Sequence, residues 1–316
     1  MRILITGATG YVGATIAERL AAKGHTVIGT ARDRAAAFAA RPHLDWIGAD
    51  FNRDLDPYVW RTRFYAIDAV INCVGAWHES ADNTFEAVHA LAPIALFQTC
   101  ARLGVKRVIH FSMLGHDRVA ESSLLATKRI ADHALASLDL DWAILAPGLI
   151  WGADAPLARF LANVATWPVV PTPSASTATL HDLARVAPIR IDDVCDAVLR
   201  LLEPSAPVRC YIPLVGPESM STVELCQRVR AAVGQHGWRS VAMPDAIARV
   251  CAALAKVDRQ HVFGTELMKI LSMDLTASTE PLVDLLGHAP ARLDRRAWAS
   301  AANRRARPAV AALRSA

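Results

Sequence analysis

Short apolar runs rich in β-branched residues alternate with helix-length segments through the first half of the chain. The runs that we expect to be strands are Ile3–Thr6, Thr26–Thr30, Leu44–Ile47, Ala69–Cys73, Arg107–Phe111 and Trp142–Leu145. The segments that we expect to be helices are Tyr11–Lys23, Arg34–Ala40, Asp56–Phe64, Thr84–Leu103 and Ser123–Leu138. Strands separated by helices form βαβ units, which give a parallel sheet with helices on both faces. The pattern therefore predicts an α/β fold with a doubly wound parallel sheet.

The pattern changes after Pro147. Residues 151–185 are rich in Pro, Ala, Ser and Thr, which is typical of a lid or a loop region. Their apolar part, which includes Phe160 and Trp167, is expected to line a cleft for a substrate or a partner. We therefore predict a smaller C-terminal lobe that begins in this segment.

Strand and helix character returns within residues 186–215. Asp192 or Asp193 is placed to cap a helix over Val194–Leu202, and Arg209–Val215 is expected to form one more strand. The predicted organisation has a core of residues 1–150 and 186–215, a smaller lobe of residues 151–185 and 216–291, and a tail of residues 292–316.

Three glycines follow the first predicted strand and open the first predicted helix. Gly7, Gly10 and Gly13 give the spacing G-x-x-G-x-x-G. The first permits a tight turn, the second lets the backbone approach a pyrophosphate, and the third lets the helix pack closely on the sheet. The helix N-terminus adds free N–H groups and a partial positive charge. This motif predicts dinucleotide binding on a Rossmann-type sheet.

The end of the second predicted strand bears on the choice between NADH and NADPH. An acid at this position binds the adenosine ribose, whereas a base pairs with a 2′-phosphate. Arg32 comes first, with Arg34 nearby, and a guanidinium binds phosphate in a bidentate manner. We therefore predict NADP(H) as the cofactor. Asp33 could instead face the ribose, and the whole segment could be a solvated charged loop.

Two further strand ends supply candidate cofactor contacts. Asp50 and Phe51 follow the third strand, where a carboxylate and an apolar neighbour can bracket an adenine, although Asp50 could equally be a loop or capping residue. Cys73, Val74 and Gly75 close the fourth strand, where a glycine lets the backbone run along a cofactor.

Composition narrows the class of protein. Hydrophobic residues make up 53% and charged residues 20% of the 316 residues, which excludes a disordered or fibrous chain. The net charge of +4 is too small to indicate a nucleic-acid-binding protein. The six cysteines are scattered, with no Cys-x-x-Cys pair and no metal-ligand spacing. No signal peptide is visible, and residues 160–180 contain three prolines, so we expect a reduced, cytoplasmic protein without a membrane span.

The C-terminal tail is basic. Residues 292–316 hold seven arginines and one acid, Asp294, a local charge of +6 that leaves −2 for the rest of the chain. The apolar stripe of any helix here would be weak, with Trp298 beside it. We expect a solvated, partly disordered tail. Contact with an acidic membrane surface or an acidic protein partner is the alternative, and nucleic acid is the least favoured partner.

The motifs together resemble the short-chain dehydrogenase/reductase superfamily in its extended or atypical branch. TGATGYVG matches the nucleotide loop of that branch, and VINCVG matches its fourth-strand motif. The match covers roughly residues 1–290 and is closest to the NAD(P)H-binding accessory subunit of respiratory complex I and its bacterial relatives. The resemblance implies cofactor contacts from Gly7, Thr9, Gly10, Tyr11, Val12, Gly13, Arg32, Asp50, Phe51, Cys73, Val74, Gly75, Lys128, Pro147 and Gly148.

The resemblance also implies an active site of Ser, Tyr and Lys, in which the Tyr acts as general acid and base. Ser112 matches the Ser and Lys128 matches the Lys, but the Tyr position holds Leu124, which can neither give nor take a proton. Ser112 could be an ordinary strand-end serine, and Lys128 could simply pair with Asp132 one turn along.

Residues near the missing Tyr and a motif after the sixth strand also bear on how the site would work. His116 and Ser123 lie close in sequence to the missing Tyr and could replace its proton transfer. Pro147 and Gly148 match a Pro-Gly motif that passes the nicotinamide, although the usual Arg before it is Ala146 and a plain turn is the alternative.

These observations leave two main functional hypotheses. The first is an NADP(H)-dependent oxidoreductase that acts on a small-molecule substrate without the usual Tyr. The second is a non-catalytic NADP(H)-binding redox sensor or assembly factor, which the substitutions at Leu124 and Ala146 favour. A sugar-nucleotide epimerase or dehydratase is a weaker alternative, because that chemistry normally needs the Tyr.

Overall fold

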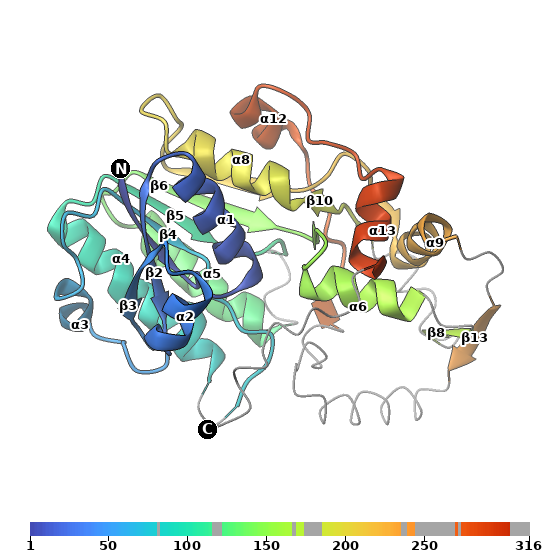
Figure 1. Cartoon of the computed structure of the whole chain (residues 1–316), viewed down its shortest axis with the longest axis horizontal. Helices are drawn as coiled ribbons and strands as arrows, with labels where there is room; N and C mark the ends of the chain where they lie inside the picture. Colours follow the sequence, from blue (N-terminus) through green and yellow to red (C-terminus); the bar gives the residue numbers. More distant parts are fainter. Residues whose placement is uncertain are drawn as a thin grey trace.

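A seven-stranded parallel sheet forms the centre of the computed structural model (Figure 1), which describes residues 1–80, 83–115, 122–165, 169–173, 185–234, 239–243, 269–270 and 273–303. The strand order is β11-β6-β5-β4-β1-β2-β3, and every neighbouring pair is parallel. The strands are β1 (Arg2–Thr6), β2 (Thr26–Ala31), β3 (Asp45–Gly48), β4 (Ala69–Asn72), β5 (Arg107–Phe111), β6 (Trp142–Pro147) and β11 (Cys210–Leu214). The predicted doubly wound α/β fold is confirmed.

Helices cover both faces of this sheet (Figure 1). They are α1 (Tyr11–Ala22), α2 (Arg34–Ala40), α3 (Pro57–Arg61), η1 (Glu86–Leu91), α4 (Ala92–Leu103), α5 (Ser123–Ala136), α8 (Ile191–Leu201) and α12 (Glu280–Leu286). Alternate residues of β1 point to opposite layers. Ile3 and Ile5 join a core with α1, α8 and α12, while Leu4 joins a core with α3, α4 and α5.

The strand order places a topological switch point at β1. Its neighbours are β2 on one side and β4 on the other, so the chain leaves β1 in one direction and returns on the other side. Ligands of open α/β sheets bind in the crevice outside the carboxyl ends of the strands at such a point. The glycine loop begins there, directly after Thr6.

The helix predicted over Thr84–Leu103 contains one wider turn. Residues Glu86–Leu91 form a π-helix that runs directly into α4. Pro93 lies in the first turn of α4 and has no backbone N–H, so it cannot donate to the carbonyl four residues earlier, at His89. The wider turn accommodates that missing bond, and such turns are frequent at functional sites.

The C-terminal lobe has its own apolar core, centred on Trp151, Met220, Val229 and Trp298. Its helices α6, α9 and α13 lie together at the right of Figure 1. The elements of this part are β7 (Ile150–Trp151), α6 (Pro156–Ala165), β8 (Val169–Pro173), β9 (Arg185–Val186), β10 (Ile189–Arg190), β12 (Met220–Ser221), α9 (Thr222–Ala232), β13 (Arg239–Met243) and α13 (Arg295–Asn303). Trp167 lies outside the described residues, and so does the side chain of Phe160.

The expectation of a solvated tail is wrong for its first part. Trp298 of α13 is buried, its ring centroid lies 4.7 Å from that of Trp151, and the Trp151 indole donates to the carbonyl of Ala297. Burial of one tryptophan outweighs the weakness of the surrounding alanine stripe. Residues 304–316 lie outside the described part of the chain.

The predicted cap of the helix after β10 is also wrong. Helix α8 begins at Ile191 with Arg190 at its N-cap, so Asp192 and Asp193 lie inside the first turn. The carboxylate of Asp193 instead accepts a hydrogen bond of 3.0 Å from the backbone N–H of Ala291. It thereby ties the segment after α12 to the sheet layer.

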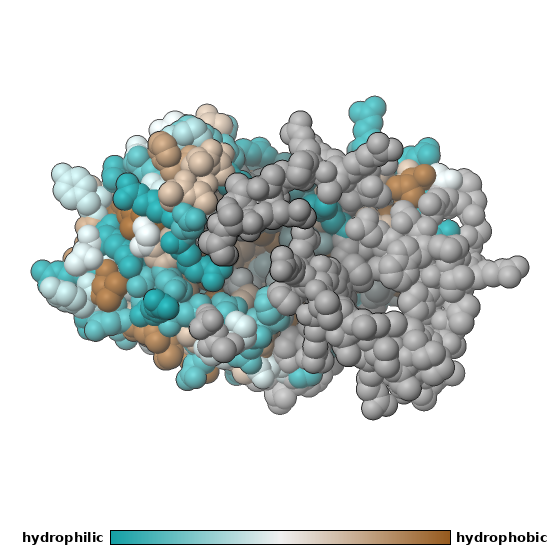
Figure 2. Space-filling view, turned by 60° about the horizontal axis from the view of Figure 1, so that its bottom comes forward, coloured by the Kyte–Doolittle hydropathy of each residue, from teal (hydrophilic) through white to brown (hydrophobic). Residues whose placement is uncertain are grey.

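Surface character gives little further information on function. On the face shown in Figure 2, the described residues are mostly hydrophilic, with hydrophobic side chains in separate small groups. Among the helices that the structure describes, none has the length and apolarity needed to cross a bilayer.

Candidate nucleotide site

A cleft of about 210 Å³ opens at the carboxyl ends of β1 to β4. The predicted cofactor contacts that line it are Gly7, Thr9, Gly10, Arg32, Asp50, Phe51, Cys73, Val74 and Gly75. Further lining residues, not predicted as contacts, are Thr30, Ala31, Ala49, Asn52, Ala76, Asn83 and Val88. Most of these flank a predicted residue, so the strand ends were a usable signal. Asn83 and Val88 belong to the segment before α4, and nothing in the sequence pattern indicated that this segment lines the cleft.

The three motif glycines allow the loop, the first helix and β4 to come into close contact. Gly7 has φ +73°, and a Cβ added to it would lie 2.8 Å from the carbonyl carbon of Cys73. A Cβ on Gly13 would lie 2.4 Å from the carbonyl oxygen of Gly7. Gly10 is the N-cap of α1, and its N–H donates to Gly7 at 3.0 Å. A side chain at Gly7 or Gly13 would close this loop, and the N-terminus of α1 beside it is suited to an anion.

Tyr11 and Val12 lie outside the cleft lining. Val12 packs against the sheet core, and Tyr11 packs against the core of the C-terminal lobe. A Cβ on Gly152 would lie 1.9 Å from the Tyr11 hydroxyl, so this ring fills the space next to the turn after β7. Burial, together with Asp154 and other acidic neighbours, raises the pKa of the Tyr11 phenol. The side chain of Tyr11 therefore links the glycine loop to the lobe.

Replacing Gly152 with alanine is expected to destabilise the protein by about 1–3 kcal/mol, because the new methyl group meets the Tyr11 hydroxyl. The double variant with Tyr11→Phe should recover part of the loss. Thermal unfolding measures both, and Gly48→Ala is the control because a Cβ there meets nothing within 4 Å. Equal stability of Gly152→Ala and the wild type would contradict this packing.

An exposed cation lies at the edge of the cleft next to β2. Arg32 lines the cleft directly after β2. Asp33 caps helix α2 instead, where its carboxylate accepts the backbone N–H of Ala36 at 2.9 Å. The carboxylate that could have faced a ribose is thus engaged in the helix cap, and the guanidinium of Arg32 remains at the cleft.

The turn after β3 is held by carboxylates. Asp50 lines the cleft, and its side chain accepts the backbone N–H of Asn52 at 3.0 Å, which confirms its loop role, while contact with an adenine stays a prediction. Phe51 is buried and packs edge-on against Trp60, with centroids 5.3 Å apart. Asp54 binds Arg63 through two contacts of 2.6 and 3.0 Å, and it also accepts the N–H of Asp50. This network fixes the wall of the cleft that carries Phe51.

Lys128, on α5, lies outside the cleft lining but next to Gly75, which lines the cleft. Its ammonium donates to the carbonyl of Phe111 at 3.0 Å, and it lies 3.9 Å from the position that a Cβ on Gly75 would occupy. His89 Nε2 lies at the same distance from that position and accepts the backbone N–H of Ala76 at 2.9 Å. Burial lowers the pKa of Lys128 to about 8, and the negative charge of Asp132 opposes this shift.

This shift predicts how stability depends on pH. Below about pH 8 both the folded and the unfolded chain carry a charged Lys128, so the cost of burying the ammonium is fully present. Between about pH 8 and 10.5 the folded chain releases this proton first, and the cost is relieved. Relative to Lys128→Met, the wild type should gain stability as the pH rises through this window. Denaturant unfolding of both proteins at several pH values checks it, and a constant difference would contradict it.

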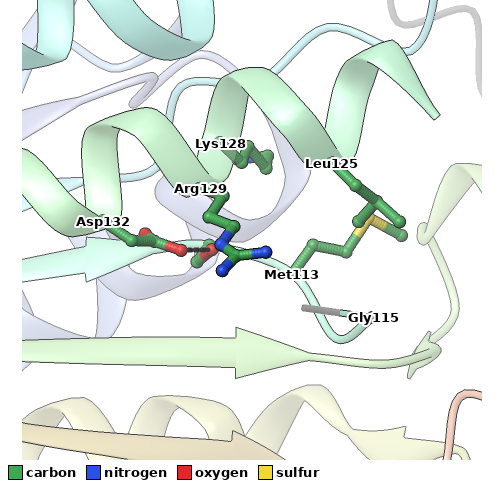
Figure 3. Close-up of a pocket in the computed structure, with 7 residues that line it drawn as sticks. Met113, Gly115, Leu125, Lys128, Arg129 and Asp132 are labelled. Carbon is green, nitrogen blue, oxygen red and sulfur yellow. Dashed lines mark hydrogen bonds between the residues drawn. The ribbon is translucent and has the colours of Figure 1, made fainter. Parts of the chain in front are cut away.

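Ser112 belongs to a buried polar cluster behind Lys128. Its hydroxyl donates to Asp132 at 2.5 Å, and His110 Nε2 lies 3.3 Å from the other carboxylate oxygen. Figure 3 shows Asp132, Arg129 and Lys128 on α5 around a small cavity that Ser112, Met113 and Gly115 help to line. The cavity holds about 10 Å³, which is room for about one water molecule.

Asn72 fixes the protonation state of His110. Its amide oxygen accepts from the backbone N–H of Val74 and from the hydroxyl of Thr6, so its amide nitrogen faces His110 Nδ1, at 3.1 Å. Nδ1 is therefore an acceptor, and the ring proton lies on Nε2, toward Asp132. Burial lowers the pKa of His110, which is consistent with a neutral ring. Hydrogen bonds thus link Thr6, Asn72 and His110, and His110 in turn lies next to the carboxylate that Ser112 binds.

The comparisons with known proteins agree with this geometry. The sequence profile of the NAD dependent epimerase/dehydratase family matches residues 3–115, which contain the glycine loop and most of the cleft lining. This match, the similarity to Ycf39 described below and the shared fold of solved epimerases support the membership of this chain in the short-chain dehydrogenase/reductase superfamily. The chain carries the NAD(P)-binding fold of that superfamily, in which solved relatives hold NAD.

Among sequence relatives, the photosystem II assembly factor Ycf39 from Synechocystis sp. is 25% identical over 79% of this chain and 72% of its own length. An uncharacterized protein of Mycobacterium bovis, Mb2073c, is 28% identical over 49% of this chain but only 16% of its own length.

Two solved superfamily structures have the same fold. A nucleoside-diphosphate-sugar epimerase from Staphylococcus aureus superposes with a TM-score of 0.72, at 16% identity over 94% of this chain and 99% of that one. The UDP-glucuronic acid 4-epimerase from Bacillus cereus superposes with a TM-score of 0.68, at 15% identity over 96% and 98% of the two chains. The narrower resemblance to the complex I accessory subunit stays an expectation.

The remaining predicted residues lie apart from the cleft lining. Leu124, at the Tyr position, is buried in the core of the lobe together with Ala146. Pro147 ends β6, and Gly148 packs between Leu114 and Leu275, so this turn is at least a packing element. His116 lies outside the described residues. In the part of the chain that the structure describes, His, Cys, Asp and Glu side chains form no group suited to a metal ion.

Proposed function

We propose that this protein binds NADP(H) and that its nucleotide is held as a ligand, without Tyr-dependent catalysis. The observation that carries the proposal is the cleft itself, which Arg32, the glycine loop and Gly75 line, with Lys128 beside Gly75. Arg32 would bind the 2′-phosphate, the N-terminus of α1 the pyrophosphate, and Lys128 the nicotinamide ribose. When bound, NADPH would place a hydride donor, its nicotinamide ring, in the site.

Three features of the region around Ser112 and Leu124 favour nucleotide binding over catalysis. Leu124 is buried and apolar, the hydroxyl of Ser112 donates to Asp132, and the cavity beside them has room for about one water molecule. A substrate carbonyl would need both an acid and space. Ycf39, a relative along most of this chain, is an assembly factor by name. We infer a similar class of role, as a nucleotide-dependent assembly or stability factor or as a redox sensor.

A turnover assay tests this part of the proposal. Purified protein with saturating NADPH is mixed with a panel of aldehydes, ketones and sugar nucleotides, and absorbance at the nicotinamide band is followed. We expect tight binding without substrate-dependent oxidation. Fast oxidation with any member of the panel, lost in Lys128→Met, would overturn the non-catalytic role and leave nucleotide binding intact.

One observation favours an oxidoreductase as the second candidate. The pKa of Lys128 is lowered to about 8, which is close to the value that suits a general acid at neutral pH. Lys128 could protonate a carbonyl oxygen while the nucleotide supplies the hydride, and solvent would then reprotonate the amine. Retained turnover in Lys128→Met would exclude this role. Epimerisation of a sugar nucleotide is less favoured, since Leu124 cannot exchange a proton with a hydroxyl group.

A further inference from the structure

Asp132 lies where β5 and α5 meet, behind the nucleotide end of the site. It is 4% exposed, and its two carboxylate oxygens face His110 of β5 and Ser112, which directly follows β5. Ser112 donates to one oxygen at 2.5 Å, and His110 Nε2 lies 3.3 Å from the other. Lys128 is one helical turn earlier on α5 and lines the same small cavity (Figure 3).

The carboxylate is held in its charged form. Burial by itself raises the pKa of Asp132, but the polar contacts from His110 and Ser112 and the charge of Lys128 outweigh it and lower this pKa. A buried carboxylate needs such partners, because an unpaired charge in the interior is costly. The cluster therefore places a negative charge one helical turn from Lys128, on the same small cavity.

Other groups near Lys128 cannot replace this charge. Cys73, on the β4 side, has a thiol whose pKa is raised by burial, so it is neutral near pH 7. His89 accepts the backbone N–H of Ala76 through Nε2, and burial keeps its pKa well below the ordinary value, so it is neutral as well. His110 is neutral by the tautomer argument above, and Arg129, which lines the same cavity, carries the wrong sign.

We propose that Asp132 is a positioning residue of the nucleotide site, whose buried carboxylate keeps Lys128 charged and oriented through the Ser112–His110 cluster. The inference rests on the proposed binding of NADP(H) beside Lys128. The physical reason is that burial disfavours the ammonium, and the nearby negative charge offsets part of that cost. Without Asp132, Lys128 would lose its proton at a lower pH, and a neutral amine binds a polar, anionic nucleotide less well.

The test is the pH profile of NADPH affinity in the full chain, measured by fluorescence titration between about pH 6 and 9. For the wild type we expect constant affinity up to about pH 8 and a decline above it. In Asp132→Asn the decline should begin about one pH unit lower, so that affinity falls several-fold near pH 7.5 but matches the wild type near pH 6. Asp132→Glu, which keeps the charge, should restore most of the wild-type profile.

Asp132→Ser is a second neutral variant in case the Asn variant does not fold, and Asp141→Asn, an exposed change at the amino end of β6, is the control. Neutral variants whose profiles run parallel to the wild type, whether lowered equally at every pH or unchanged, would overturn the role of Asp132. A Glu variant that shifts as far as the neutral ones would do the same. Failure of the wild type to bind NADPH at any pH would instead refute the proposed function on which the inference rests.

Discussion

Gly7→Ala is expected to abolish NADPH binding at concentrations that saturate the wild type. At φ +73° an alanine carries a strain of about 1–2 kcal/mol. Its Cβ would also lie 2.8 Å from the carbonyl carbon of Cys73, which belongs to the backbone and cannot rotate away. The loop must therefore move off β4, and the N–H groups that face a pyrophosphate move with it. We expect a loss of affinity of at least about a hundredfold, roughly 2.7 kcal/mol.

Gly24→Ala is the matched control for backbone strain. Gly24 has φ +82°, but a Cβ there meets nothing within 4 Å. This variant should lose about 1 kcal/mol of stability and keep its affinity for NADPH. Titration and thermal unfolding of both variants separate strain from close packing. If Gly7→Ala binds NADPH as tightly as Gly24→Ala does, the close approach of the loop to β4 is not what builds the site.

Arg32→Ala is expected to remove the preference for NADPH over NADH. The guanidinium lies at the edge of the cleft next to β2, where it would make charge-assisted bonds with the 2′-phosphate. Such bonds contribute about 1.5–3 kcal/mol, so the affinity for NADPH should fall by roughly ten- to a hundredfold. Affinity for NADH, which lacks the phosphate, should change little, and the ratio of the two dissociation constants is the measurement.

Arg34→Ala is the control for net charge, because Arg34 is exposed, lies two residues further along and is not part of the cleft lining. It should leave the ratio close to that of the wild type. A loss of NADPH affinity as large in Arg34→Ala as in Arg32→Ala would show that general positive charge, and not one guanidinium, selects the cofactor.

Much of this fold could be predicted because local and global signals agree in it. Each sheet strand predicted in the first half of the chain ends within two residues of its observed position, and β11 occupies the position expected from residues 209–215. Buried parallel strands are continuous apolar runs, and Gly7, with its positive φ and close contacts, is a position that few other residues tolerate.

The parts that could not be predicted depend on contacts between residues distant in the sequence. Asp132 was weighed only as a partner of Lys128, because nothing local shows that β5 would place His110 and Ser112 against it. The apolar stripe of helix α13 is weak in the sequence. Its Trp298 is buried because it packs against Trp151, which is distant in the sequence. Aspartate is a common helix N-cap residue, but the carboxylate of Asp193 accepts the N–H of Ala291, which is distant in the sequence.

A fluorescence titration of the purified protein with NADPH and NADH side by side tests whether the cleft binds NADP(H). We expect saturable binding of both nucleotides, with NADPH at least tenfold tighter, roughly 1.4 kcal/mol. Binding of neither nucleotide would contradict this expectation, and the glycine loop would then be a structural element of the fold that holds no nucleotide.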